Sequence, residues 1–211
     1  MSVATIPLRV LPVTARGSLT ICIYCGAAVG RRKIFEEQTR AAARVIVAAG
    51  HRVYGGAKNG LMGVMADEAL KLGGTVVGVI PALLVDKELL HKGLSEIHIV
   101  ASMHERKKKM SELAEVFLAL PGGAGTLEEL VEQWTWTQLG IHAKPCGVLE
   151  RRRIFRTIAD DGGQDGRRRF PARAQPGVAH LQPVHRGRAR RPRAVSRAVG
   201  KILMGNLPLR D

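Results

Sequence analysis

The residues with the clearest chemical potential follow one predicted strand, in the stretch Pro121-Gly122-Gly123-Ala124-Gly125-Thr126-Leu127-Glu128-Glu129. A buried strand over residues 116–120 runs through this glycine-rich turn into a helix. Glycines let backbone N–H groups approach a ligand, and the N-terminus of a helix favours an anion such as phosphate. The stretch is neither a dinucleotide-binding G-x-G-x-x-G pattern nor a P-loop, because no lysine follows its last glycine. We therefore expect a phosphate-binding turn here.

Two carboxylates follow this turn, and they have different interpretations. Thr126 and Glu129 have the spacing of a capping box, whose side chains only satisfy backbone donors, so a structural and a functional role are equally open for Glu129. Glu128 is not explained as a cap. A carboxylate next to a bound phosphate repels it, so this residue is expected to interact with a positive charge. Beside the ribose of a nucleotide it could stabilise a developing oxocarbenium ion and orient water.

A second polar group, Ser102-Met103-His104-Glu105-Arg106-Lys107-Lys108-Lys109-Met110, opens a predicted helix directly after a strand over residues 96–100. Ser102 and Glu105 form another capping box. The last two lysines have glutamates one helical turn away, which is typical of a solvated face. Arg106 and Lys107 are the candidate ligands for a phosphate or a base, although spacing alone favours a solvated face for them as well.

Cys22 and Cys25 form a C-x-x-C pattern, which raises the possibility of a redox or zinc site. Both lie at the end of an apolar run, where an odd separation along a strand places them on opposite faces. A thioredoxin-type pair would instead lie at the start of a helix. We expect both to be small buried residues.

The remaining sequence predicts alternating strands and helices. Strands are expected at residues 19–24, 51–54, 75–80, 96–100, 116–120 and 146–149, and helices at 32–49, 61–72, 102–114 and 126–139. The strands are continuous apolar runs, which is typical of a doubly wound, Rossmann-like parallel sheet with helices on both faces. Ligands bind such sheets beyond the carboxyl ends of the strands. Glycine-rich turns fall at three of these ends, at residues 25–30, 55–63 and 121–125.

Most of the net charge of +15 lies in one part of the chain of 211 residues. Residues 1–150 carry 17 Lys and Arg against 14 Asp and Glu, and residues 151–211 carry 16 against 4. The longest uncharged runs have 14 residues, too few for a membrane-spanning helix. We expect a cytoplasmic protein with a flexible extension over residues 1–17, a nucleotide-binding catalytic domain over 18–149 and an arginine-rich tail over 150–211.

Taken in order, four motifs resemble the LONELY GUY family of cytokinin riboside 5′-monophosphate phosphoribohydrolases, many of which are labelled lysine decarboxylases. They are Cys25-Gly26 after the first strand, Val53-Tyr54-Gly55-Gly56 with Gly60-Leu61-Met62-Gly63, Met103-His104-x-Arg106-Lys107, and Pro121-Gly-Gly-x-Gly-Thr126-x-x-Glu129. The resemblance covers about residues 19–149. It implies hydrolysis of the N-glycosidic bond of an N6-modified adenosine monophosphate, without a metal or an organic cofactor.

The resemblance also implies roles for individual residues. Arg106 and Glu128 would be the catalytic pair, with Glu129 in support. The substrate-binding residues would be Gly26, Gly56, Met62, Glu88, Lys107, Gly122, Gly123, Ala124, Gly125, Thr126, Leu127 and Thr135. The partners would be a nucleotide monophosphate and further copies of the chain, in a homodimer or a larger homo-oligomer, with no membrane.

The tail departs from the family, which continues after Leu149 with an acidic-aromatic turn and a helix. Here Glu150 is followed by three arginines and by sequence without a helical or strand period. The tail is either a frameshift product or a disordered arm, and only a genuine tail would bind nucleic acid. The alternative to an enzyme is a non-catalytic nucleotide or molybdenum-cofactor binding protein on the same fold.

Overall fold

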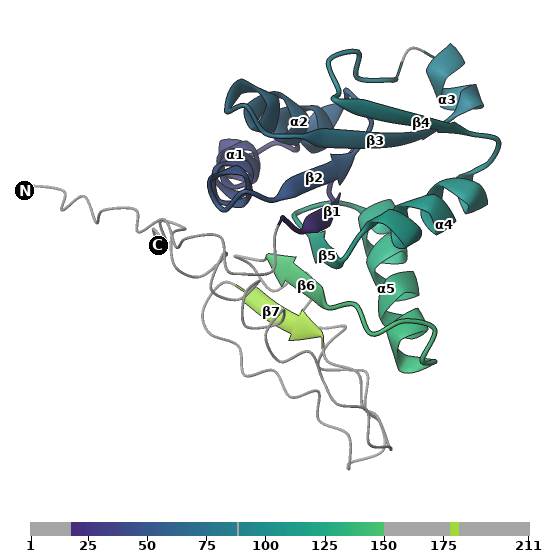
Figure 1. Ribbon diagram of the computed structural model, residues 1–211. Coiled ribbons are helices and arrows are strands. Elements are labelled where there is room, and N and C mark those ends of the chain that lie inside the picture. Colours follow the sequence, from purple (N-terminus) through teal and green to yellow (C-terminus); the bar gives the residue numbers. More distant parts are fainter. Residues whose placement is uncertain (1–17, 88, 150–177, 182–211) are drawn as a thin grey trace, which may run out of the picture.

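The computed structural model describes residues 18–87, 89–149 and 178–181 (Figure 1). The predicted extension over residues 1–17, the predicted site residue Glu88 and all but four residues of the predicted tail lie outside these ranges. No helix in the described ranges is both long and apolar enough to cross a membrane.

The described strands form one sheet in the order β4-β3-β2-β1-β5-β6-β7. Their bounds are β1 (Thr20–Tyr24), β2 (Arg52–Gly55), β3 (Val76–Pro81), β4 (Glu96–Val100), β5 (Val116–Ala119), β6 (Cys146–Leu149) and β7 (Val178–Leu181). Strands β1 to β6 are parallel, and β7 pairs with β6 in the antiparallel sense. In the central register, Cys22 of β1 lies between Tyr54 of β2 and Phe117 of β5.

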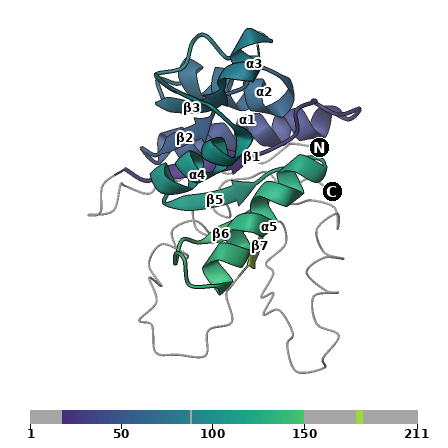
Figure 2. The ribbon, with the colours of Figure 1, turned by 90° about the vertical axis from the view of Figure 1, so that its right-hand side faces the viewer.

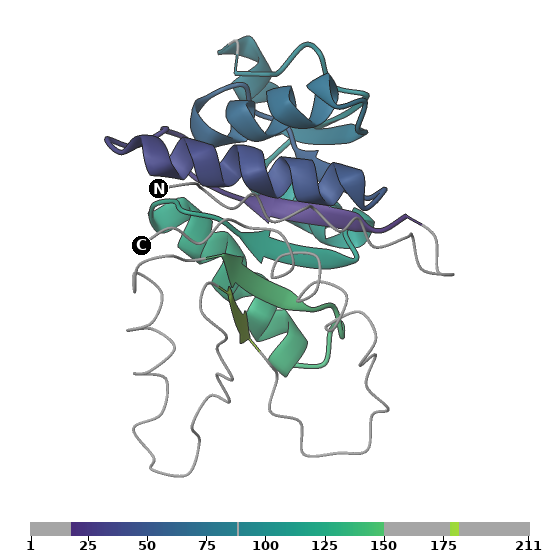
Figure 3. The same cartoon turned by 90° about the vertical axis from the view of Figure 1, so that its left-hand side faces the viewer.

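Helices cover both faces of this sheet. They are α1 (Lys33–Ala48), α2 (Gly60–Lys71), α3 (Ala82–Asp86), α4 (Met103–Leu113) and α5 (Ala124–Gln138). Figure 2 shows α4 and α5 in front of the sheet, and Figure 3, from the other side, shows α1 and α2. Each face has its own hydrophobic core, with Ile46 and Met65 in one and Met110 and Leu130 in the other. The prediction of a doubly wound parallel sheet is confirmed.

The two faces separate Cys22 from Cys25, as the odd spacing predicts. Cys22 belongs to the core beneath α4 and α5, and Cys25 to the core beneath α1 and α2. Both are buried free thiols. Burial raises the pKa of each thiol, that of Cys25 to about 12. These cysteines are therefore packing residues, because a reactive or metal-binding cysteine needs its thiolate form.

Two elements differ from the sequence-based expectation. The helix α3 follows Pro81 directly and is only five residues long, too short to show a helical period. The strand β7 lies inside the segment in which no period was expected. Its four residues pair with β6 on the side away from β5. A strand this short shows no detectable alternation of apolar and polar residues.

Candidate functional site

Three loops meet at the carboxyl edge of the parallel strands, and Gly26 links them. Its N–H donates to the carbonyl of Pro121 at 3.0 Å, and its carbonyl accepts from the N–H of Leu61 at 2.9 Å. The loop after β1 therefore joins the turn before α5 to the N-terminus of α2. Gly60 permits this close approach, because it has a φ of +59° and a Cβ there would lie 2.3 Å from the carbonyl carbon of Ala27.

The turn between β5 and α5 presents backbone N–H groups. Gly123 is the N-cap of α5 in an extended conformation, with no side-chain cap. Gly123, Ala124 and Gly125 are all exposed. The first N–H groups of a helix have no acceptor within it, and its N-terminus carries partial positive charge. This turn is therefore suited to a phosphate group.

The capping-box interpretation of Thr126 and Glu129 is wrong. The helix α5 begins at Ala124, so Thr126 lies inside its first turn, where its side chain is buried. The extended conformation of Gly123 starts the helix earlier than the threonine predicts. The Thr126 hydroxyl occupies the space next to Gly122, where a Cβ would lie 2.1 Å from Thr126 Oγ1. Gly122 is thus required for close packing within the turn.

Arg106 of α4 and Glu129 of α5 form a largely buried ion pair. Arg106 Nη1 donates to Glu129 Oε1 at 2.9 Å, and their side chains are 12% and 15% exposed. Arg106 Nε also donates to the carbonyl of Val79 in β3 at 3.1 Å. Burial raises the pKa of Glu129, although the charge and hydrogen bond of Arg106 partly offset this effect. Glu129 is therefore a carboxylate held in place by an arginine that is itself anchored to the sheet.

Lys107, the next residue of α4, contacts a different pair of carboxylates. Its Nζ donates to Glu128 Oε1 at 2.6 Å and to Glu132 Oε1 at 3.0 Å. The hydrogen bond with Glu128 raises the pKa of Lys107, burial opposes this and Glu132 adds to it. The solvated-face interpretation is thus wrong for Arg106 and Lys107. It holds for Lys108, which is exposed and lies 4.0 Å from Glu112.

The capping box at the start of α4 is confirmed in modified form. Ser102 is the N-cap, and its hydroxyl accepts from the N–H of Glu105 at 3.1 Å. The Glu105 carboxylate turns back to the N–H of Ala101, one residue before the cap. This arrangement fixes the start of α4 and hence the direction in which Arg106 and Lys107 leave it.

The other predicted site residues are more scattered. Gly56 is buried after β2, where a Cβ would come within 3.0 Å of the Val79 backbone. Met62 packs against the core beneath α1 and α2, and Leu127 packs against the opposite core. Thr135 is exposed on α5. Within the described residues, no three His, Cys, Asp or Glu side chains come together as a metal site would require.

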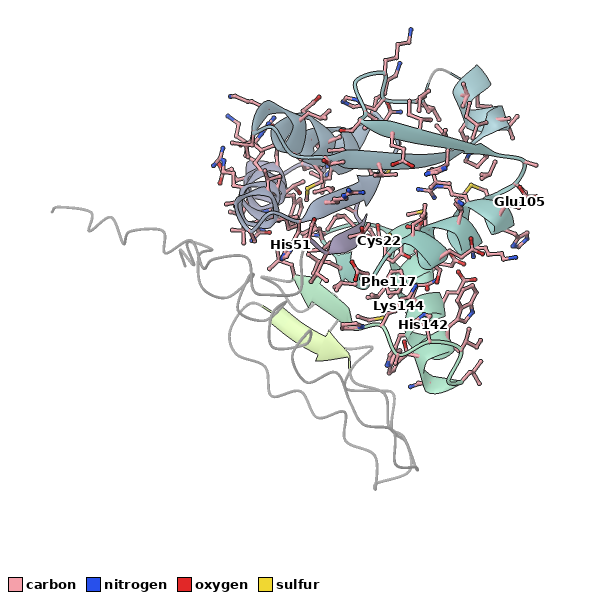
Figure 4. The ribbon with its side chains drawn as sticks, in the orientation of Figure 1. Cys22, His51, Glu105, Phe117, His142 and Lys144 are labelled. Carbon is pink, nitrogen blue, oxygen red and sulfur yellow. The ribbon has the colours of Figure 1, made fainter. Side chains whose placement is uncertain are left out.

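A second polar cluster lies at the opposite edge of the sheet, in the loop that leads into β6 (Figure 4). His142 Nδ1 accepts from the N–H of Lys144 at 3.3 Å, and the ring packs against Phe117 with centroids 5.5 Å apart. Lys144 Nζ donates to the carbonyl of Ser111. Burial lowers the pKa of His142, and Lys144 lowers it further. This cluster anchors the α5–β6 loop and is separate from the carboxyl edge.

Comparison with known proteins adds evidence of relatedness. A family model described as possible lysine decarboxylase matches residues 62–160. A cytokinin riboside 5′-monophosphate phosphoribohydrolase from Rhodococcoides fascians is 42% identical over 161 residues, which is 75% of this chain and 81% of that protein. The chain belongs to the cytokinin riboside 5′-monophosphate phosphoribohydrolase family, and the resemblance to LONELY GUY proteins is confirmed.

Other family members match a shorter part of the chain. An Arabidopsis thaliana member is 44% identical over 130 residues, which is 61% of this chain and 57% of that protein. A probable member from Oryza sativa is 45% identical over 130 residues and is covered over 57% of its length. The chain thus spans little more than half the length of these plant relatives.

Solved structures extend the similarity of fold beyond the phosphoribohydrolase family. The molybdenum cofactor carrier protein from Chlamydomonas reinhardtii superposes with a TM-score of 0.57 and 17% identity, over 89% of this chain and 99% of that one. A molybdenum cofactor binding protein from Rippkaea orientalis gives a TM-score of 0.56 at 16% identity, over 69% and 83% of the two chains. At these identities the comparison establishes the fold alone.

For this phosphoribohydrolase family member, the structure brings together Arg106, Lys107, Glu128 and Glu129 beside the β5–α5 turn. It also adds Glu132, which the sequence analysis missed. Glu128 and Glu132 are one turn apart on α5, and two like charges at this spacing destabilise a helix unless a cation lies between them. The spacing of these two glutamates could therefore have predicted a cation, such as a lysine, between them. Nothing in the sequence indicates the Val79 carbonyl as an anchor for Arg106.

Proposed function

We propose that this protein hydrolyses the N-glycosidic bond of an N6-modified adenosine 5′-monophosphate. The C1′–N9 bond breaks, the oxygen of water bonds to C1′, and the base leaves with a proton, giving free base and ribose 5-phosphate. The observation that carries the proposal is the largely buried Arg106–Glu129 pair next to the exposed N-terminal turn of α5. The name of the Rhodococcoides fascians relative supports the same substrate class.

The substrate phosphate would lie on the turn at Gly123, Ala124 and Gly125, where N–H donors and the helix dipole favour it. This position brings the ribose toward the carboxylates of α5. A carboxylate at that point stabilises positive charge that develops at C1′ as the base departs. The Arg106–Glu129 distance supports Glu129 in this role, because Arg106 fixes its orientation. Glu128 is 57% exposed and pairs with Lys107, so it remains able to approach the substrate.

The lysine chemistry supports hydrolysis over decarboxylation. A Schiff-base lysine must lose its proton to act as a nucleophile. Lys107, at the carboxyl edge, is held in its charged form by Glu128 and Glu132, and its pKa is raised. Burial lowers the pKa of Lys144, but its Nζ is bonded to the carbonyl of Ser111 at the other edge of the sheet.

Nucleotide or molybdenum-cofactor binding without catalysis is the second candidate. Its support is the shared fold of the carrier proteins. A protein that only binds an anion gains nothing from three carboxylates beside the binding turn, since each repels the phosphate. The arrangement of Glu128, Glu129 and Glu132 therefore favours the enzyme.

The test is incubation of the purified chain with AMP and with isopentenyladenosine monophosphate, followed by chromatography of the released base. We expect release by the parent and near-complete loss in Arg106→Ala and Glu129→Gln. Both variants are first checked for an unchanged circular dichroism spectrum and for AMP binding. Binding of either nucleotide without release of base by the parent would favour the carrier alternative.

We further infer that the protein forms a homodimer or a larger homo-oligomer. Several large apolar side chains are exposed, among them Ile99, Leu139 and Ile141. Neighbouring exposed apolar side chains are typical of association surfaces, and Leu139 and Ile141 lie two residues apart at the end of α5. Light scattering coupled to size exclusion measures the mass in solution, and a monomer at micromolar concentration would contradict the proposal.

A further inference from the structure

Lys107 is held between two carboxylates that differ in their access to solvent. Its Nζ lies 2.6 Å from Glu128 Oε1 and 3.0 Å from Glu132 Oε1. The Lys107 side chain is 14% exposed, whereas Glu128 is 57% and Glu132 is 25% exposed. Glu128 therefore faces solvent and any incoming ligand, while Glu132 lies deeper between α4 and α5.

The second oxygen of Glu132 indicates what this residue does. Glu132 Oε2 is buried and has no hydrogen-bond partner among the described residues. A buried acceptor without a partner costs about 1–3 kcal/mol of stability, and a charged one costs more. A residue that served only to stabilise α5 would not carry this penalty. The contact of Glu132 with Lys107 is the interaction that offsets it.

The ion pairs of Lys107 must also rearrange when a nucleotide binds. Both cations, Arg106 and Lys107, are already paired with carboxylates. A phosphate that approaches the β5–α5 turn can use Lys107 only if one carboxylate leaves it. The exposed Glu128 is free to leave, and the more buried Glu132 is not.

We propose that Glu132 is a positioning residue, which keeps the Lys107 ammonium beside the first turns of α5 while Glu128 exchanges between Lys107 and the bound nucleotide. The inference rests on the proposed function, since the nucleotide is what draws Glu128 and Lys107 apart. Glu132 acts through Lys107 and does not itself touch the substrate.

A labelling experiment tests the contact without using activity. The parent, Glu132→Gln and Glu128→Gln are treated with acetic anhydride, and acetylation at each lysine is measured by mass spectrometry. We expect Lys107 to be labelled several-fold faster in Glu132→Gln than in the parent, and Glu128→Gln measures the separate effect of the exposed carboxylate. Lys108, which is exposed in every variant, is the internal reference. Equal labelling of Lys107 in the parent and in Glu132→Gln would overturn the proposal.

A double-mutant cycle tests the route through Lys107. We expect Glu132→Gln to raise KM for AMP roughly tenfold with little change in kcat, as loss of a charge-assisted hydrogen bond in the binding step requires. In the Lys107→Met background the same substitution should add nothing. Glu112→Gln, on the exposed side of α4, is the matched control and should leave both constants unchanged. Additive effects of Lys107→Met and Glu132→Gln would refute positioning through Lys107.

The two proposals fail in different ways. A parent that releases no base contradicts the proposed function, and the acetylation of Lys107 still decides the role of Glu132. An active parent with unchanged Lys107 labelling in Glu132→Gln contradicts the role of Glu132 alone.

Discussion

Glu129 Oε1 accepts from Arg106 Nη1 at 2.9 Å, and this contact joins two helices that enter the site from different strands. The same guanidinium donates through Nε to the carbonyl of Val79, so the arginine is fixed to the sheet before any ligand arrives. A charged group held in this way does not have to reorient when the reaction occurs. Such preorganisation is the main source of electrostatic catalysis. The pair is therefore a preformed element of the site.

The first prediction separates the two adjacent glutamates. Glu129→Gln should reduce kcat for release of adenine from AMP by at least about 100-fold, because it removes the charge that stabilises the cationic ribose. Glu128→Gln should keep more activity than Glu129→Gln, since Glu128 is exposed and is not held by Arg106. Chromatographic assays at saturating AMP measure both. Greater loss in Glu128→Gln would transfer the catalytic role to that residue.

The second prediction concerns the pH dependence of stability. Burial raises the pKa of Glu129, so ionising this residue costs more free energy in the folded protein than in the unfolded chain. Its contribution to stability is full below the pKa of an unfolded glutamate and is lost as pH rises through the raised value. Thermal unfolding should be measured for the parent and Glu129→Gln between the pKa of an unfolded glutamate and the raised pKa of Glu129. Over this range the stability of the variant should increase relative to that of the parent as pH rises. A constant difference between the two would contradict the raised pKa.

Activity should respond to the same group in the opposite direction. The proposed role requires ionised Glu129, so kcat should fall as pH decreases through its raised pKa. This fall should begin at a higher pH than for an ordinary exposed carboxylate. A pH–kcat profile of the parent checks this point, and the acidic limb should disappear from the residual activity of Glu129→Gln.

The third prediction uses two neighbouring glycines as matched variants. A Cβ on Gly122 would lie 2.1 Å from Thr126 Oγ1, whereas one on Gly123 meets nothing within 4 Å. Gly122→Ala should therefore destabilise the fold by about 1–3 kcal/mol through overpacking. Gly123→Ala should unfold like the parent but bind AMP more weakly, because its methyl group stands where phosphate would approach. Urea unfolding and calorimetric titration with AMP measure the two effects, and equal AMP affinity in Gly123→Ala and the parent would exclude this turn as the phosphate site.

The fourth prediction concerns an ionic contact between α1 and α2, away from the site. Glu68 of α2 is buried and accepts from Arg40 at 3.1 Å and from Arg44 at 2.6 Å. Burial alone would raise the pKa of Glu68, but the hydrogen bonds from Arg44 and Arg40 lower it below the usual value. Glu68→Gln should cost about 1–2 kcal/mol at neutral pH, since both arginines are partly solvated.

The cost of Glu68→Gln should depend on pH with a defined sign. A lowered pKa stabilises the fold above the unfolded pKa, and this stabilisation is lost as pH falls through the folded value. The parent and the variant should therefore converge in acid. Glu37→Gln, on the exposed side of α1, serves as a control and should behave like the parent at every pH.

The sequence predicted the sheet because its strands are uninterrupted apolar runs. Val116–Ala119 and Cys146–Leu149 are buried at every position, so no alternation competes with the assignment. The same reasoning failed for Val178–Leu181, whose pairing with β6 joins segments far apart in sequence. Short-range patterns carry no information about such a pairing.

At the site, residue types were predictable and their partners were not. The position of Arg106 and Glu129 at strand ends follows from the order of elements. The pairing of Arg106 with Glu129, and of Lys107 with Glu128, depends on how α4 and α5 are rotated about their axes. That rotation depends on how each helix packs on the sheet, where Met110 and Leu130 belong to one core. No spacing within either helix reveals it. The Thr126 capping box was misleading for a different reason, because α5 begins two residues before it, at Ala124.

Gly26 couples the conformations of two loops, so substitutions in one loop affect the other. Because the backbone of one residue contacts both the N-terminus of α2 and the turn ahead of α5, a change that reshapes either loop is transmitted to the other. Under the proposed function, we therefore expect a change in the loop ahead of α2 to alter phosphate binding at the turn ahead of α5. We expect substitutions at residues 57–60 to weaken AMP binding, and changes near Pro121 to restore it.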